Sequence, residues 1–246
     1  MKPVLVALFP FLLATNVFGQ IDNPEFTAVA KKFEKGNFES ALESAESLID
    51  NDKHRKKPEP YLWASMCYYA IHNSDLEKLQ ERFSAPLKNA LKYAGKAVQK
   101  DKDNTIVENN LEYFETMKRE GVAFAKEYEA SDDHRKALYT YKQILNFVPN
   151  DPYVLFAKGV SELRQSATYD AEKDIAESFP VLDQRYRDID YVPDPATSPL
   201  LKDAVVYYID HLILNAYVDS ARTVAMTARV FFPLDEGIKA TLEGIK

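Results

Sequence analysis

Apolar residues recur at steps of three and four positions along almost the whole chain after Asn23, which is the period of an α-helix. Stretches in which apolar and polar residues alternate with a period of two are hard to find. Glycine is also scarce, with seven in 246 residues. The pattern therefore predicts an all-α fold.

One spacing on these helices returns five times. In the stretch from Asp132 to Leu163, Ala137 is followed by apolar residues four and seven positions later. Four other alanines open the same spacing, namely Ala41, Ala90, Ala171 and Ala221, with a serine, Ser178, at the last position after Ala171. In several copies a small or apolar residue lies 12 positions upstream, namely Val29, Ala125, Gly159 and Ile209. Because an alanine lets a neighbouring helix approach closely, the pattern predicts an array of antiparallel helix-turn-helix hairpins.

The stretch from Gly121 to Asp151 resembles the tetratricopeptide repeat (TPR) family, whose hairpin has about 34 residues. Its segment KALYTYKQILNFVPND is similar to the second helix of that hairpin and its closing proline, Pro149. The next segment, YVLFAKGVSEL, carries Gly159 where the family prefers a small residue. The resemblance implies a right-handed solenoid of stacked hairpins.

Two more segments extend this resemblance. YLWASMCYYAI places Trp63 and Cys67 at the aromatic and small positions of a first helix, and NAYVDSARTVAMTARVFFP repeats the turn, helix and proline near the end of the chain. The five alanines are 49, 47, 34 and 50 residues apart, so the array is degenerate or carries insertions. The final PLDEGIKATLEGIK predicts a polar-faced helix that caps the array.

The N-terminal segment predicts export. Lys2 is followed by an apolar run from Val4 to Ala14 and by a small-residue site that fits cleavage before Gln20. Residues 1–19 are therefore predicted to be a signal peptide, with an uncleaved anchor as the alternative. The rest of the chain, 20–246, is predicted to be one repeat domain without a transmembrane segment. With one cysteine and no N-glycosylation sequon, the predicted location is the bacterial periplasm or the extracellular medium.

Capping residues and breaks in the pattern mark the connections. Asn23, Asp151 and Ser198 each precede a proline, as N-cap residues do. The apolar spacing from Asn104 to Tyr128 predicts one long helix, or two that are kinked near Gly121. The sequence also predicts an inserted turn and short helix over residues 74–86 and an irregular loop over residues 187–198.

The charge count argues against a nucleic-acid partner. The chain has 31 basic and 38 acidic residues, for a net charge of −7, and the acidic residues are scattered. The run Lys53–Pro58 (KHRKKP) is the one cationic patch, either a solvated loop or a contact for an anionic lipid or polysaccharide.

No pattern in the sequence points to catalysis, a metal ion or a cofactor. The cluster of Asp50, Asp52 and His54 favours a solvated turn over a metal site. The stretch that begins at Asp101 matches a calcium loop at its first, third and twelfth positions, but Ile106 replaces the required glycine, so it predicts an ordinary corner. Motifs of hydrolases, metalloproteases and nucleotide-binding enzymes are absent. We therefore expect a protein that is not an enzyme.

The TPR resemblance implies a groove lined by the first helix of each hairpin. Counted from Pro152, the lining residues are Tyr153, Phe156, Val160 and Arg164, and the matching positions of the hairpin that holds Trp63 include Tyr61, Tyr68 and His72. The tyrosines suit peptide recognition. Packing between hairpins is the alternative role for each aromatic residue.

These observations favour an exported, non-enzymatic scaffold that holds a peptide or helix of a partner protein, in an envelope or secretion assembly. The rival hypothesis is a protein that binds or processes a small molecule or glycan. In it the 187–198 loop covers the groove and supplies Asp188, Asp190, Tyr191 and Asp194. A closed pocket under the loop would favour the rival, and an open groove would favour the scaffold.

Overall fold

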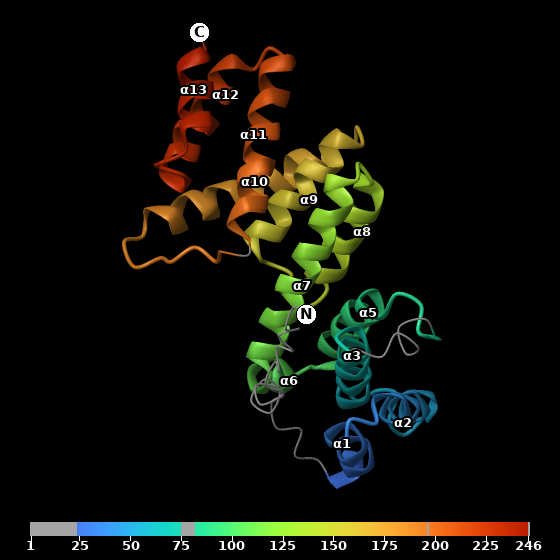
Figure 1. Ribbon diagram of the computed structural model, residues 1–246. Helices are drawn as coiled ribbons and strands as arrows, with labels where there is room; N and C mark the ends of the chain where they lie inside the picture. The colour runs from blue at the N-terminus through green and yellow to red at the C-terminus, as the bar shows by residue number, and fades with distance from the viewer. Residues whose placement is uncertain (1–23, 75–81, 196, 246) are drawn as a thin grey trace, which may run out of the picture. The chain divides into compact units, whose positions relative to one another are not determined.

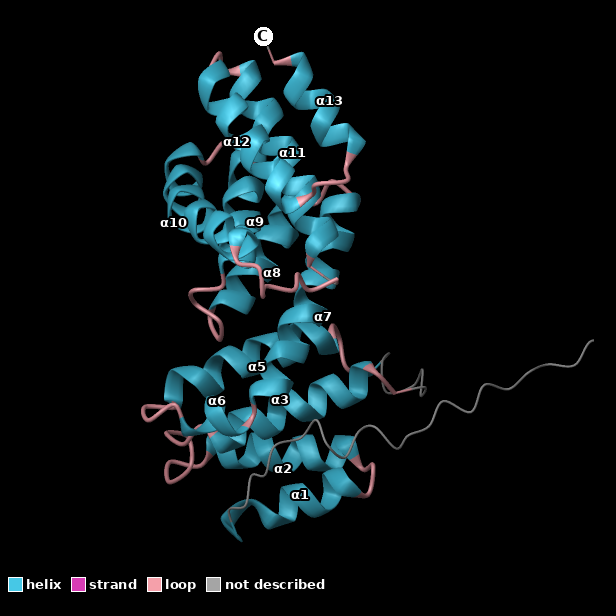
Figure 2. Ribbon diagram, turned by 90° about the vertical axis from the view of Figure 1, so that its left-hand side faces the viewer, coloured by secondary structure: helices cyan, strands magenta, loops and turns pink. Residues whose placement is uncertain are grey.

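The computed structural model describes residues 24–74, 82–195 and 197–245, and this part of the chain contains helices and no strand (Figures 1 and 2). The predicted all-α, TPR-like helical-repeat fold is confirmed by helices that pack as adjacent hairpins. Contacts group the residues into an N-terminal unit, residues 1–117, and a C-terminal unit, residues 118–246. The prediction of a single domain over residues 20–246 stays a prediction. The predicted signal peptide lies outside the described residues.

The N-terminal unit is built from consecutive helices that pack against their neighbours. Helix α2 contacts α1 and α3, and α3 also contacts α5. The elements are η2 (Pro24–Phe26), α1 (Thr27–Glu34), α2 (Phe38–Asp50), α3 (Glu59–His72), α5 (Pro86–Lys100), α6 (Thr105–Asn109) and the first turns of α7 (Leu111–Ala130). Most of the insertion predicted over residues 74–86 lies outside the described residues.

The C-terminal unit contains two hairpins stacked in register. Helix α9 packs against α10, and α11 packs against α12. The first helices of the two hairpins, α9 and α11, contact each other, and so do the second helices, α10 and α12. The unit also contains the remainder of α7 and the whole of α8 and α13. Its complete helices are α8 (His134–Leu145), α9 (Pro152–Arg164), α10 (Thr168–Arg187), α11 (Ser198–Leu214), α12 (Val218–Phe231) and α13 (Glu236–Gly244). As predicted, α13 follows the last hairpin and packs on α12.

The alanine pattern is the core of both units. All five alanines are fully buried, and Val29, Ala125 and Ile209 are buried 12 positions upstream of their alanines. Gly159 shows how close the helices come, because a Cβ built there would lie 2.9 Å from Ile175 Cγ1 and 3.1 Å from the Ala171 carbonyl oxygen. A larger residue would therefore push α9 away from α10.

Four connections between helices have the same three-residue form, namely α1–α2, α7–α8, α9–α10 and α11–α12. The middle residue has a left-handed backbone with φ between 61° and 73°, at Gly36, Asp132, Ser166 and Ala216. In each case the next residue donates its N–H to a carbonyl five positions back, at 2.9 to 3.0 Å. This pattern ends a helix and satisfies its last carbonyl groups. Each left-handed residue lies five positions before one of the buried alanines, and Ala85 (φ 51°) stands in the same relation to Ala90.

The helix boundaries correct two sequence-based predictions. The interruption between Asn104 and Tyr128 falls at Asn110 and not at Gly121, because the Asn110 side chain donates to the Ile106 carbonyl and ends α6. Asp151 caps α9 as predicted, accepting from the N–H groups of Tyr153 and Val154. Ser198 is instead the first residue of α11, and its hydroxyl donates to the Asp194 carbonyl within the preceding loop.

None of the helices in the described ranges has the length and apolar character needed to span a bilayer. Cys67 is buried in α3, where burial raises the pKa of its thiol.

The left-handed turns generate a stability prediction. Ala216 holds φ at 63°, a conformation that costs a residue with a Cβ about 1 kcal/mol more than glycine. We expect Ala216→Gly to raise the free energy of unfolding by about 0.5 to 1 kcal/mol, measured by urea denaturation. Gly36→Ala is the reverse control, since no atom lies within 4 Å of the added Cβ, and it should destabilise the protein. A loss of stability in Ala216→Gly would contradict this account of the turn.

Candidate functional site

Three of the residues predicted to line a groove lie on α3 in the N-terminal unit. Tyr61 is buried, and its hydroxyl donates to the Arg55 carbonyl at 2.8 Å. Tyr68 is half-buried and donates to Glu46 Oε1 at 3.0 Å, while burial and the Glu46 carboxylate raise the pKa of this tyrosine. His72 is half-buried in the last turn of α3. The hydroxyls of Tyr61 and Tyr68 are thus both held within the N-terminal unit, although Tyr68 and His72 keep part of their surface exposed.

The other four residues lie on α9 in the C-terminal unit. Tyr153 is buried, and its hydroxyl lies 2.7 Å from the hydroxyls of both Tyr186 and Tyr191. Phe156 has no exposed surface and packs against the rings of Phe179 and Tyr208. In this structure these two side chains serve the core, which was the alternative role for the aromatic residues. Val160 is itself 3% exposed, and together with Arg164 it lines the pocket described next, whereas Tyr153 and Phe156 do not.

Val160 and Arg164 line an open pocket with a volume of about 270 Å³. Helices α7, α8, α9 and α11 form its walls. Its apolar lining residues are Ala130, Ala157, Val160, Leu200 and Ala204. Its charged lining residues are Lys126, Glu129, Arg164 and Asp203. A pocket of this composition suits a ligand group with an apolar body and a polar end.

Two buried polar atoms on this pocket have no hydrogen-bond partner. Tyr141 has no exposed surface, and its hydroxyl group is unpaired. The Arg164 Nε–H is buried and unpaired as well. Because an unpaired buried donor costs about 1 to 3 kcal/mol, these atoms mark a place where an acceptor from outside the chain would be stabilised. Burial and the Glu129 carboxylate raise the pKa of Tyr141, so its hydroxyl keeps its proton.

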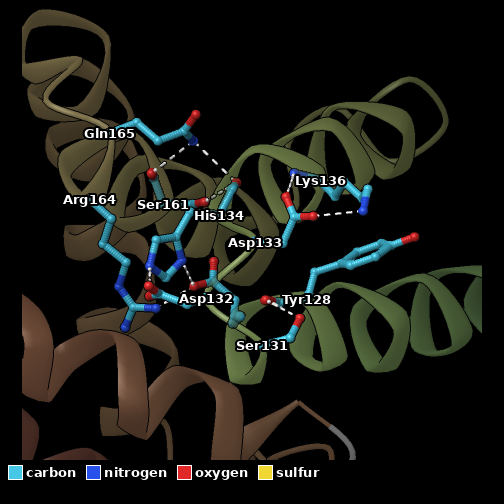
Figure 3. Close-up of polar contacts among 10 residues, drawn as sticks. Tyr128, Ser131, Asp132, Asp133, His134, Lys136, Ser161, Arg164 and Gln165 are labelled. Atoms are coloured by element: carbon cyan, nitrogen blue, oxygen red, sulfur yellow. Dashed lines mark hydrogen bonds and ion pairs between the residues drawn. The ribbon is translucent and has the colours of Figure 1, made fainter.

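A polar cluster in the α7–α8 turn holds Arg164 in place (Figure 3). The ring of His134 lies between two carboxylates, with Nδ1 2.8 Å from Glu129 Oε2 and Nε2 2.8 Å from Asp132 Oδ1. Arg164 pairs with Glu129 through Nη1, and its guanidinium lies 4.4 Å from the centroid of the Tyr207 ring. The turn therefore fixes one wall of the pocket through a shared carboxylate.

The same cluster lacks the arrangement of a nucleophilic enzyme. Ser161, the hydroxyl nearest to His134 in Figure 3, donates to the main-chain carbonyl of His134 and not to its ring. Gln165 donates to the same carbonyl. A serine nucleophile requires a hydrogen bond to the imidazole, so this cluster supports α8 and α9 structurally.

The predicted 187–198 loop is tied to its own unit and not to the pocket. The hydroxyl of Tyr191 lies on Tyr153, and Arg119 Nε lies 2.9 Å from Asp194 Oδ2. Ile189 and Val192 are 96% and 83% exposed. None of the loop residues that the structure describes lines the pocket, so the rival hypothesis of a lidded site is not favoured.

The basic run Lys53–Pro58 is tied to the N-terminal unit by ion pairs. Lys53 and Lys57 both pair with Glu25, and Arg55 pairs with Asp52 at 3.0 Å. These lysines lower the pKa of Glu25 from 4.5 to about 2, chiefly through the hydrogen bond from Lys53. The run therefore anchors the first helices, while Lys56 is exposed and forms no ion pair in the described residues.

Asp101, the first residue of the stretch that resembles a calcium loop, has a structural role. Asp101 Oδ2 accepts from the N–H groups of Ile106 and Val107 at 2.9 and 3.1 Å, so it caps α6 at the predicted corner. Over residues 24–74, 82–195 and 197–245, no group of three or more potential ligands is arranged to hold a metal ion.

The comparisons with known proteins include a structural likeness to a solved repeat protein. No family model matches the chain, and no curated protein matches it significantly in sequence. The crystal structure of the C-terminal part of a TPR repeat-containing protein from Cytophaga hutchinsonii is 15% identical over 88% of this chain and 99% of that chain, with a TM-score of 0.34. The assignment of the fold rests on the packing of the helices described above.

The unpaired hydroxyl of Tyr141 generates a prediction with an internal control. Tyr141→Phe removes a buried group that has no partner, so we expect the free energy of unfolding to rise by about 1 kcal/mol. Tyr113 is equally buried, but its hydroxyl donates to Ser65 Oγ at 2.7 Å, since the Ser65 proton goes to the Ala90 carbonyl. Tyr113→Phe should therefore lower the free energy of unfolding by about 1 kcal/mol. Urea denaturation of both variants checks the prediction, and equal losses would show that Tyr141 is hydrogen-bonded in solution.

Proposed function

We propose that the chain is a non-enzymatic protein–protein interaction scaffold that holds a segment of a partner protein, extended or helical, on its C-terminal unit. The observation that carries the proposal is the open pocket beside Val160 and Arg164, with an apolar floor and two unpaired buried donors. Stacked hairpins provide such surfaces without a reactive side chain.

The chemistry of the pocket suits a peptide. An apolar side chain of the partner would cover Val160, Ala204 and their apolar neighbours, and each buried CH₂ group contributes about 0.8 kcal/mol. A carbonyl oxygen of the partner would accept from the guanidinium of Arg164, whose side chain is 19% exposed. Asp203, on the opposite wall, would accept from a partner N–H. A peptide carries all three groups on one short stretch of chain.

The proposal includes export, to the bacterial periplasm or the extracellular medium, within an envelope or secretion assembly. It is supported by the apolar run and small-residue site of residues 1–19. When the full chain is expressed with its own N-terminus in a bacterial host, we expect the exported fraction to hold a protein that begins at Gln20. Mass spectrometry of the N-terminal peptide checks this. A protein that stays in the cell with residues 1–19 still attached would count against export.

Partner binding is tested with the charges at the rim of the pocket. Lys126 and Asp203 line the pocket and form no ion pair within the part of the chain that the structure describes, so Lys126→Glu with Asp203→Lys should leave the fold intact. We expect a protein that crosslinks to the wild type in the native envelope fraction to be lost from this double variant. The matched control is Lys173→Glu with Glu177→Lys, which exchanges two exposed charges on α10.

The outcome is read against both variants. Equal recovery from the wild type, the pocket variant and the control would reject the pocket as the binding surface. A Tyr153→Ala or Arg164→Ala variant is unsuitable here, because both side chains hold the unit together through Tyr186, Tyr191 and Glu129.

A further inference from the structure

Helix α5 in the N-terminal unit presents a row of lysines to solvent. Lys92, Lys96 and Lys100 lie four residues apart, so they follow one another at about 6 Å along the helix. Lys92 and Lys100 are exposed and Lys96 is half-buried. None of the three pairs with a carboxylate in the described ranges, in contrast to Lys53 and Lys57.

Tyrosine rings lie in contact with the lysines of this row. Tyr93 lies between the lysines and stacks on Tyr68 with ring centroids 5.6 Å apart and an interplanar angle of 13°. The ammonium groups of Lys96 and Lys92 lie 5.1 and 5.8 Å from the centroid of Tyr93, and that of Lys100 lies 5.9 Å from Tyr61. These cation–π contacts order the lysine side chains before any partner arrives.

The positive charges of the three lysines repel one another. Like charges four residues apart on a helix repel one another. Partial burial and the charges of Lys92 and Lys100 lower the pKa of Lys96. An anion between the lysines would relieve this repulsion. The chain as a whole carries a net charge of −7, so the row is a local exception to its own surroundings.

We propose that Lys92, Lys96 and Lys100, with Tyr61, Tyr68 and Tyr93, form a lysine face that binds an acidic segment of a protein. A partner helix with carboxylates at every fourth position matches the 6 Å repeat of the row. This face belongs to the N-terminal unit, so it is a second interaction surface and does not depend on the pocket proposed above.

A protein partner fits this face better than a nucleic acid because acidic groups border it. Tyr68 donates to Glu46, and burial, together with the carboxylates of Glu46 and Asp50, raises the pKa of Tyr93. Both carboxylates therefore lie close to the tyrosine rings of the face. They would repel a continuous chain of phosphates, whereas single carboxylates on a helix can avoid them.

The test uses the purified chain and a fluorescent 16-residue peptide with glutamate at every fourth position in an alanine and glutamine background. At an ionic strength of about 0.05 M we expect saturable binding by fluorescence anisotropy that weakens as salt is added. The triple variant Lys92→Gln, Lys96→Gln, Lys100→Gln should bind at least about 10-fold more weakly. Its matched control removes three other lysines without ion pairs, Lys31→Gln, Lys35→Gln and Lys173→Gln, and should bind like the wild type.

Two results would overturn the proposal. One is the absence of saturable binding, or an equal loss in the two triple variants, which would show that only net charge matters. The other is tighter binding of a single-stranded oligonucleotide of equal charge that is lost in the lysine-face variant, which would make the face a nucleic-acid site. Circular dichroism spectra of both variants establish that the helices are retained. The pocket variants leave this face unchanged, so failure here and failure of the proposed scaffold pocket are separate results.

Discussion

The close approach of each second helix to the first helix of its hairpin is the constraint on which the rest of the structure depends. It is produced by two local features that always occur together. A left-handed residue ends one helix and redirects the chain, and five positions later an alanine without a bulky side chain meets the preceding helix. At α9 and α10 the space is too small even for a Cβ at Gly159. Where the turn has three residues, the buried pair is 12 positions apart in sequence, whereas the connection from α3 to α5 is longer.

This constraint decides which surfaces are left for binding. In the C-terminal unit, α9 packs on α10 and on α11, so Tyr153 and Phe156 are enclosed between hairpins. Val160 and Arg164 lie further along the same helix, at the opening between α7, α8 and α11, where Arg164 is held by Glu129. The pocket exists because small residues, Ala130, Ala157 and Ala204, line the place where four helices meet. In the N-terminal unit the packing of α3 against α5 brings Tyr61 and Tyr68 beside the lysines of α5.

Charge has two different roles in the two units. Around Glu25, Glu129 and Asp194, opposite charges meet and fix turns or loops to helices. Along the lysine face and at the pocket rim, charges remain without partners inside the described part of the chain. Exposed ion pairs contribute little to stability, about 0 to 1 kcal/mol each, so the unpaired charges cost the fold little and remain available for recognition. The protein thus separates the charges that position its backbone from those that a partner can reach.

The sequence by itself determined the fold class, the five alanine stripes, the Asp151 cap and the capping helix at the end of the chain. These features are local, since the helical period, capping and small-residue spacing depend on residues within one or two turns of each other. The left-handed turns gave a weaker signal, because Asp132, Ser166 and Ala216 lack the glycine that marks such a backbone. Only the tertiary structure decided which tyrosines are buried, that Lys53 and Lys57 pair with Glu25 and that Tyr141 and Arg164 leave donors unpaired on one pocket. Each of these depends on groups that lie far apart in sequence, and a helical period shows which face is apolar but not what will cover it.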